Sequence, residues 1–187
     1  FAAGNRIAQW RSKVGDHVAV PLREGQLPVW REHELGTLPV VDMAAGVDAS
    51  GFPLQFATSV SGAKTVFMVV GTANGGGWLW GSDDSSSRTF HRGGGCVGSV
   101  ITDNWATTSY GVKDSLAWRN GRAFNVYQSH PGGGYELLSF MRSSDAAFNP
   151  IAGFAFDYKS SATRLGYQQL AEFIAYDVQL DDAARQK

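Results

Sequence analysis

The chain has 187 residues, of which 43% are hydrophobic and only 18% are charged, and it contains 23 glycines but 6 prolines. A chain of this length can bury about 70% of its unfolded surface in one large β domain, so it needs no disulfide or metal to fold. The net charge of −1 argues against nucleic acid as a partner, and no apolar run reaches the length of about 18 residues that a membrane-spanning helix needs.

Short strand-like segments separated by turn residues follow one another from Leu38 onward, after some forty residues of sparse pattern. Residues 65–70, TVFMVV, are apolar or β-branched throughout, which is typical of a buried central strand. In residues 170–176 strict alternation would place the even-numbered and odd-numbered side chains on opposite faces. The other predicted strands are 39–43 and 52–57, which we expect to form the first pair, then 78–80, 88–91, 135–140 and 151–156.

Two local signals mark a hairpin and a helix. Asn120-Gly121 lies between two apolar-alternating arms in residues 116–124, and this dipeptide favours a type I′ turn, in which both central residues take a positive φ. Asp181 precedes residues 182–185, DAAR, as a helix cap would, with a further acid in the first turn. About ten short strands and one short C-terminal helix predict an all-β, two-sheet antiparallel sandwich.

One domain over residues 1–187 is predicted, because no internal repeat or charged linker divides the sequence. The chain starts at Phe1 and stops at Lys187 inside the expected helix. We therefore expect it to be part of a longer or processed protein whose targeting signal lies outside this sequence.

Residues 166–185, GYQQLAEFIAYDVQLDDAAR, resemble the closing strand and short helix of laminin-G-like jelly rolls in the concanavalin A-like lectin and glucanase superfamily. In that family an Ala-Glu pair opens a hydrophobic strand, which is followed by Tyr-Asp, a leucine and an acidic helix start that ends in arginine. Trp10, residues 39–42, residues 65–70 and the Asn120-Gly121 hairpin match in the family's order. The resemblance implies a jelly-roll fold, a place outside the cell or on a cell or virion surface, and calcium in some members.

The catalytic motifs of this fold are not found in the chain. Its glycosidases carry Glu-x-Asp-x-x-Glu on one strand, where alternate residues face the same way. Only Glu32 and Glu34 have that spacing among the five glutamates, and a solvated loop with local ion pairing is the favoured interpretation there. Its lyases need a Gln-x-His strand, whereas in residues 127–130, YQSH, His130 precedes Pro131 and three glycines, which indicate a loop and not a strand. We lean against an enzyme, with a polysaccharide-degrading activity as the third alternative.

Sugar binding typically stacks an exposed aromatic ring on a pyranose and surrounds it with planar polar side chains. Trp105 follows Asp103 and Asn104 in a polar segment and is the best candidate for such a ring. Trp78 and Trp80 share one strand face in the predicted alternation, and we interpret them chiefly as core residues. The candidate ligand-binding residues are Asp103, Asn104, Trp105, Tyr110, Trp80, Arg88 and His91.

Metal binding has one candidate segment. Cys96 is the single cysteine, and the four histidines show no metal-ligand spacing. Asp83 and Asp84, followed by three serines, supply the oxygen ligands that calcium prefers, although the same string is an ordinary turn. No cofactor is required by the sequence, and calcium at Asp83 and Asp84 is an open expectation.

The sequence therefore predicts a non-catalytic recognition module that binds a glycan on a secreted or surface protein. The alternative is a structural or adhesion subunit of an extracellular or virion assembly, in which a free β edge or the glycine-rich loops contact a protein partner or another copy. Exposed aromatic rings favour the first, and aromatic rings buried against neighbours favour the second. Neither nucleic acid nor membrane insertion is expected.

Overall fold

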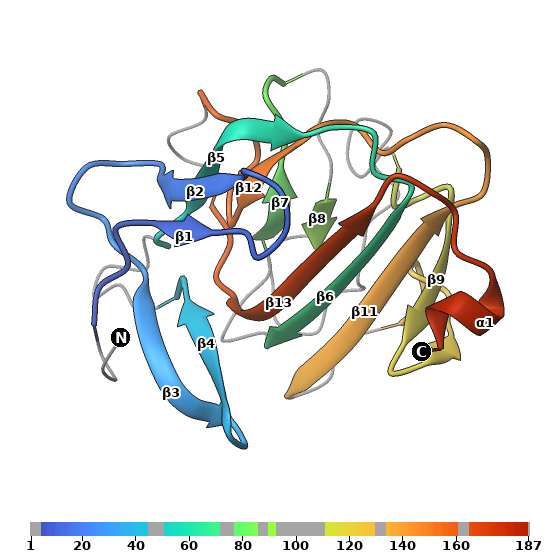
Figure 1. Ribbon diagram of the computed structural model, residues 1–187, viewed down its shortest axis with the longest axis horizontal. Coiled ribbons are helices and arrows are strands. Elements are labelled where there is room, and N and C mark those ends of the chain that lie inside the picture. Colours follow the sequence, from blue (N-terminus) through green and yellow to red (C-terminus); the bar gives the residue numbers. More distant parts are fainter. Residues whose placement is uncertain are drawn as a thin grey trace.

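The computed structural model describes residues 5–44, 51–71, 77–85, 90–92, 111–129, 134–160 and 165–186, with the backbone alone for residues 77, 78, 91 and 92. The described chain forms two antiparallel sheets and one short helix (Figure 1). The predicted all-β sandwich is thus confirmed. Among the described residues no helix is long enough to cross a bilayer, since α1 (Asp182–Arg185) has four residues.

The larger sheet has seven strands, and the predicted strand at residues 65–70 lies at its centre. Every pairing in both sheets is antiparallel, as expected for strands joined by short turns. In spatial order the seven strands are β10 (Arg122–Ala123), β9 (Ser115–Arg119), β11 (Tyr135–Arg142), β6 (Thr65–Gly71), β13 (Gln169–Tyr176), β4 (Leu38–Asp42) and β3 (Val29–Leu35).

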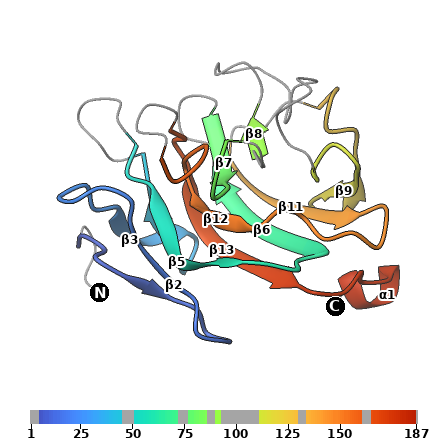
Figure 2. The same ribbon diagram turned by 90° about the horizontal axis from the view of Figure 1, so that it is seen from above.

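The smaller sheet has six strands and begins with the hairpin nearest the N-terminus. The β1–β2 hairpin lies beside β5 and continues the sheet beyond it (Figure 2). In spatial order the strands are β1 (Trp10–Arg11), β2 (Val18–Pro21), β5 (Leu54–Val60), β12 (Ile151–Phe154), β7 (Gly77–Gly81) and β8 (Phe90–Arg92).

Two expectations from the sequence need correction. The predicted strands at 39–43 and 52–57 exist as β4 and β5 but do not pair, because β4 lies between β3 and β13 while β5 lies between β2 and β12. Glu32 and Glu34 lie in strand β3 and not in a loop. An irregular register between Arg31 and Leu35 and a positive φ of 57° at His33 interrupt that strand, which hides its pattern in the sequence.

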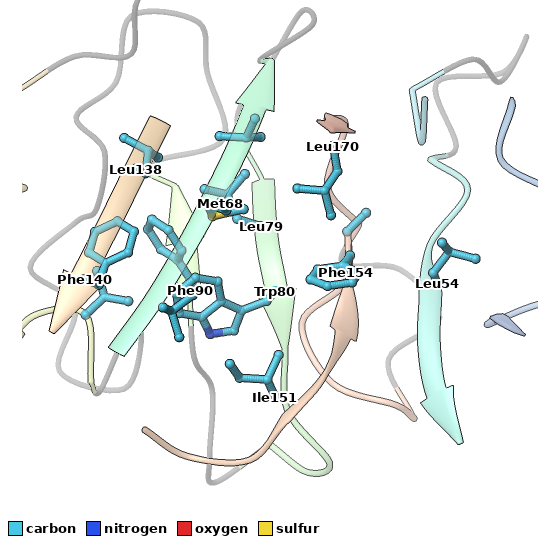
Figure 3. Packing of buried hydrophobic residues seen from close by; sticks show 14 of the residues in the cluster. Leu54, Met68, Leu79, Trp80, Phe90, Leu138, Phe140, Ile151, Phe154 and Leu170 are labelled. Carbon is cyan, nitrogen blue, oxygen red and sulfur yellow. The ribbon is translucent and has the colours of Figure 1, made fainter. Parts of the chain in front are cut away.

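A core of aromatic and aliphatic side chains joins the two sheets (Figure 3). Trp80 of β7 is fully buried at its centre, with ring centroids 4.7 Å from Phe90 of the same sheet and 5.9 Å from Phe140 of the opposite sheet. Leu54 and Phe154 extend this core toward the β5 side of the smaller sheet. Rings at these separations and tilted geometries contribute packing energy beyond the area they bury.

The two local signals of the sequence are confirmed. Asn120 and Gly121 take φ values of 50° and 78° between β9 and β10, as a type I′ turn requires. Asp181 caps α1, and its carboxylate accepts a hydrogen bond of 2.7 Å from the backbone N–H of Ala184. The guanidinium of Arg185 lies 3.8 Å from the ring centroid of Trp118, which fastens α1 to the outer face of β9.

Strand β13 does not follow simple alternation. Its pairing with β6 has an irregularity between Leu170 and Glu172, which is the signature of a β-bulge. The bulge lets Leu170 and Phe173 both face the core, whereas Glu172, Ile174 and Tyr176 are exposed. The expected grouping of all even-numbered residues on one face therefore fails at Leu170.

Candidate functional site

A groove of about 520 Å³ lies between the β1–β2 hairpin and strand β13. Its volume falls in the range of roughly 300–1,000 Å³ that is usual for ligand pockets. We call it the hairpin–strand groove. It is lined by residues 10–15, His17 and Ala19 of the hairpin, Phe56 and Val60 of β5, Phe154 of β12 and residues 171–175 of β13.

The floor of the groove is a cluster of aromatic rings. The ring of Phe154 lies 4.9 Å from Phe173, 5.3 Å from Phe56 and 6.1 Å from Trp10, measured between centroids. Phe154 is almost fully buried, whereas Trp10 is half-buried at the wall. Trp10 and Phe173, which rest on the buried Phe154, are therefore the rings that offer apolar surface to an apolar side chain or to one face of a sugar ring.

A glycine positions the floor. Gly153 lies where β12 changes register against β5, and its φ of 151° is one that residues with a Cβ rarely adopt. A Cβ at this position would meet the carbonyl oxygen of Leu54 at 2.1 Å. The close approach of the two backbones at Gly153 thus sets where the next residue, Phe154, enters the groove.

The hairpin turn supplies the rim of the groove and its positive charge. The turn is closed by hydrogen bonds from the backbone N–H of Ser12 to the carbonyl of His17, at 2.9 Å, and from the Ser12 hydroxyl to the carbonyl of Gly15, at 2.9 Å. Arg11 and Lys13 extend from this turn, and no ion pair to a carboxylate is found for either within the described part of the chain. Asp16 is also exposed in this turn, outside the groove lining, and offsets part of that charge. The two cations outnumber it, so the rim can attract a negatively charged group.

The ring of His17 is held in place by two contacts with β5. Its Nδ1 lies 3.1 Å from the carbonyl oxygen of Thr58, and its ring meets Phe56 edge-on at 5.9 Å between centroids. The contact with a carbonyl oxygen requires Nδ1 to carry the proton, so Nε2 is left as the ring's second polar atom. His17 lines the groove, so this nitrogen is one of the few polar atoms there that a ligand can use.

One wall of the groove is the edge of a strand. Five consecutive residues of β13, 171–175, line the groove although they point alternately to opposite faces of the sheet, so the groove runs along the strand's edge. On this side β13 pairs with β4 only at Gln169 and Leu170. The two strands meet at one end and then diverge (Figure 1). Within the described chain, the edge from Ala171 to Tyr176 has no β-sheet partner on the groove side.

The groove does not bring two acids together. Glu172 is the single carboxylate among its described lining residues, and it lies on the exposed face of β13. Glu32 and Glu34 are exposed on β3, outside the groove. General acid–base hydrolysis of a glycosidic bond needs a pair of carboxyl groups that flank the bond. This arrangement of described residues supports binding and offers no such pair.

Most of the candidates for sugar contact lie outside the residues that the structure describes. Trp80 is buried in the core with 0% exposure, which removes its ring from ligand contact and places it in the role we favoured for the Trp78 and Trp80 pair. His91 lies on β8, where the backbone alone is described. The remaining candidates, Arg88, Asp103, Asn104, Trp105 and Tyr110, lie outside the described residues.

Asp83 and Asp84, the calcium candidates, are exposed after β7. One carboxylate oxygen of Asp83 lies 2.8 Å from the Lys159 ammonium and accepts a hydrogen bond of 2.7 Å from the Ser59 hydroxyl. Burial would raise the pKa of Asp83, but these hydrogen bonds outweigh it, so its pKa is lowered. Within the described chain no three histidine, cysteine or acidic side chains converge as a metal site. A calcium ion at Asp83 would have to displace Lys159.

The hairpin–strand groove was not predicted from the sequence. Trp10 was recognised only as a fold position, because a lone tryptophan in a sparse segment carries no sign of what faces it. The hairpin in which Arg11 pairs with Val18 has one weak local signal, the short polar segment SKVGD between its two arms. Contact with β13 joins residues at opposite ends of the chain, which local patterns do not reveal.

Comparison with known proteins finds no matching family model, curated protein or solved structure.

Proposed function

We propose that the chain is a non-catalytic recognition module that binds a segment of a partner protein in the hairpin–strand groove. The observation that carries this proposal is the groove's composition: the half-buried rings of Trp10 and Phe173 pack on the buried Phe154, and Arg11 and Lys13 lie at the rim. Buried aromatic anchors surrounded by a polar rim are the usual anatomy of a protein-binding hot spot. This proposal is related to the adhesion or assembly role that the sequence offered as the alternative to glycan binding, and it fits the expected laminin-G-like module on a secreted or surface protein.

Selection from a random peptide library displayed on phage, with the full 187-residue chain immobilised, tests the proposal. Val14 lines the groove and is 87% exposed, so Val14→Asp changes the groove without disturbing the core. Leu116→Ala is the matched control, since Leu116 is also exposed but lies on β9, away from the groove. We expect selected peptides to lose at least about tenfold in affinity for Val14→Asp and to bind Leu116→Ala unchanged. Peptides that bind both variants equally, or no peptides at all, would overturn the proposal.

A glycan is the second candidate ligand, and one observation favours it. The half-buried Trp10 ring lies in the groove with Arg11 and His17 beside it, which is an aromatic ring with planar polar neighbours. A glycan array with the full chain, repeated with Trp10→Ala and with Trp105→Ala, separates the two rings. Retention that depends on Trp10 places the sugar in the groove, and retention that depends on Trp105 places it where the sequence predicted. No retained glycan would leave the protein ligand as the proposal.

A further inference from the structure

We infer that the partner segment binds as an added β-strand along the free edge of β13, as an extended peptide with apolar side chains at alternate positions and an acidic residue at the hairpin end. This inference rests on the proposed function and adds the binding mode and the chemistry of the ligand.

The free edge provides the backbone partners for such a strand. Between Ala171 and Tyr176, β13 is paired with β6 on one side and, within the described chain, with no strand on the groove side. In an antiparallel strand alternate residues direct their N–H and C=O groups to the same side, so about half of these six residues present both groups to the groove. A peptide of roughly six residues, about 20 Å long when extended, matches this stretch. Strand addition is a known mode of peptide recognition, in which backbone hydrogen bonds give affinity.

The groove beside the edge selects the side chains. A strand laid along β13 continues its pleat, so every second side chain points toward the inner face, where the half-buried Phe173 packs on the buried Phe154. These positions favour valine, isoleucine or leucine. The intervening side chains point to the outer face beside Ile174 and Tyr176, which are 37% and 40% exposed and tolerate polar neighbours.

Positive charge on the hairpin determines which residue is preferred at the adjacent end of the peptide. Arg11 and Lys13 line the groove there, and neither has an ion-pair partner in the described part of the chain. Glu172, the one carboxylate of the described lining, is borne by β13 itself, on the opposite wall. An acidic residue at the hairpin end of the peptide is therefore complementary to the rim, and a lysine there is not.

The test uses the ¹⁵N-labelled full chain and three types of synthetic hexapeptide with capped ends, each made in two versions. All three alternate valine with threonine; the first has glutamate at one end, the second has lysine instead, and the third is the glutamate peptide with one central backbone nitrogen methylated. Nuclear magnetic resonance follows the amide shifts, and hydrogen exchange follows the protection of the amides of residues 171–176. Each type is synthesised once with its charged residue at the amino end and once with it at the carboxyl end, so that both strand directions are tested.

We expect the glutamate peptide to shift the amides of residues 171–176 and to protect those that face the groove, about half of them. We expect the methylated peptide to bind about two- to tenfold more weakly, and the lysine peptide to bind more weakly than the glutamate peptide. Lys13→Glu should reverse the preference between glutamate and lysine, which a loss of folding would not do. Lys113→Glu, with a lysine outside the groove lining, is the matched control and should leave the preference unchanged.

Three results would overturn the inference. Peptides from the library that depend on Val14 but leave the exchange of residues 171–176 unchanged would remove strand addition while the proposed function stands. Protection of these amides that rises with the concentration of the chain alone would assign the edge to a second copy. Perturbation of the groove by glycans and not by any of the peptides would assign it to a sugar, and the proposed protein ligand would fail with it.

Discussion

Replacement of Gly153 by alanine is expected to destabilise the fold more than the same replacement at Gly121, the glycine of the β9–β10 turn. The new Cβ would lie 2.1 Å from the carbonyl oxygen of Leu54 and 2.7 Å from the Cα of Gln55, whereas ordinary contact begins at 3.4 Å. The two backbones would have to separate by about 1.3 Å, the difference between 3.4 and 2.1 Å, at the pairing of β12 with β5. Neither atom belongs to a flexible side chain that could move aside.

The size of the effect follows from two contributions. Overpacking of a tight site costs about 1–3 kcal/mol, and a φ of 151° in a residue with a Cβ costs about another 1–3 kcal/mol. The free energy of unfolding should therefore fall by about 2–6 kcal/mol, a large part of the roughly 5–15 kcal/mol typical of a domain. Gly121→Ala is the control, because Gly121 also has a positive φ, 78°, but nothing lies within 4 Å of its added Cβ. That variant should lose only about 1–2 kcal/mol.

Urea denaturation followed by tryptophan fluorescence measures both variants. The reasoning is refuted if Gly153→Ala and Gly121→Ala unfold at the same urea concentration, because the backbone contact at Leu54 would then carry no energy. Because Gly153 precedes Phe154, a partly folded Gly153→Ala should also show reduced peptide binding in the groove. If the destabilised Gly153→Ala variant still binds the peptide with unchanged affinity, the close backbone contact at Gly153 does not determine the position of the groove floor.

Three further predictions concern the core, the pKa of a tyrosine and the ion pair of the buried Asp42 with the partly exposed Arg31. Trp80→Ala should lower the free energy of unfolding by about 3–5 kcal/mol, as measured by urea denaturation, because the ring is fully buried; a loss below about 1 kcal/mol would contradict its place in the core. Burial, with Glu34 and Asp42 nearby, raises the pKa of Tyr135 to about 12, above the value of about 10 in an unfolded chain. The stability contributed by neutral Tyr135 is thus complete below pH about 10 and is lost as the pH rises toward about 12, so ultraviolet titration should show one late tyrosine that Tyr135→Phe lacks. Asp42→Ala should cost about 1–3 kcal/mol in the same denaturation assay, because it removes the acceptor of Arg31 and of the Ala44 N–H, and an unchanged midpoint would show that neither bond matters.

Local chemistry decided what the sequence could predict. The Asn120-Gly121 turn and the Asp181 cap depend on neighbouring residues alone, and both were predicted to the residue. Residues 65–70 were placed correctly at a sheet centre because apolar side chains on both faces suit no other position. These features need no knowledge of what lies across the fold.

Long-range contacts explain what the sequence did not predict. Assignment of β4 and β5 to different sheets depends on partners a hundred or more residues away, such as Leu170 for Val41 and Phe154 for Leu54. The groove joins Trp10 to Phe173 through Phe154, and no local pattern links these three positions. Trp80 illustrates the same limit, because a tryptophan on a predicted strand is equally compatible with the core and with a sugar-binding face.

The edge of β13, which has no strand partner on the groove side among the described residues, also has a consequence for solubility. Residues 170–176, LAEFIAY, are rich in strand-forming apolar residues, and such a segment with an open edge is a template for cross-β association between chains. Glu172 is the only charged side chain in the segment, and the bulge beside it twists the edge away from a flat register. A charged side chain within such a segment opposes association of identical chains, because like charges would face one another, and Glu172 has this position on β13.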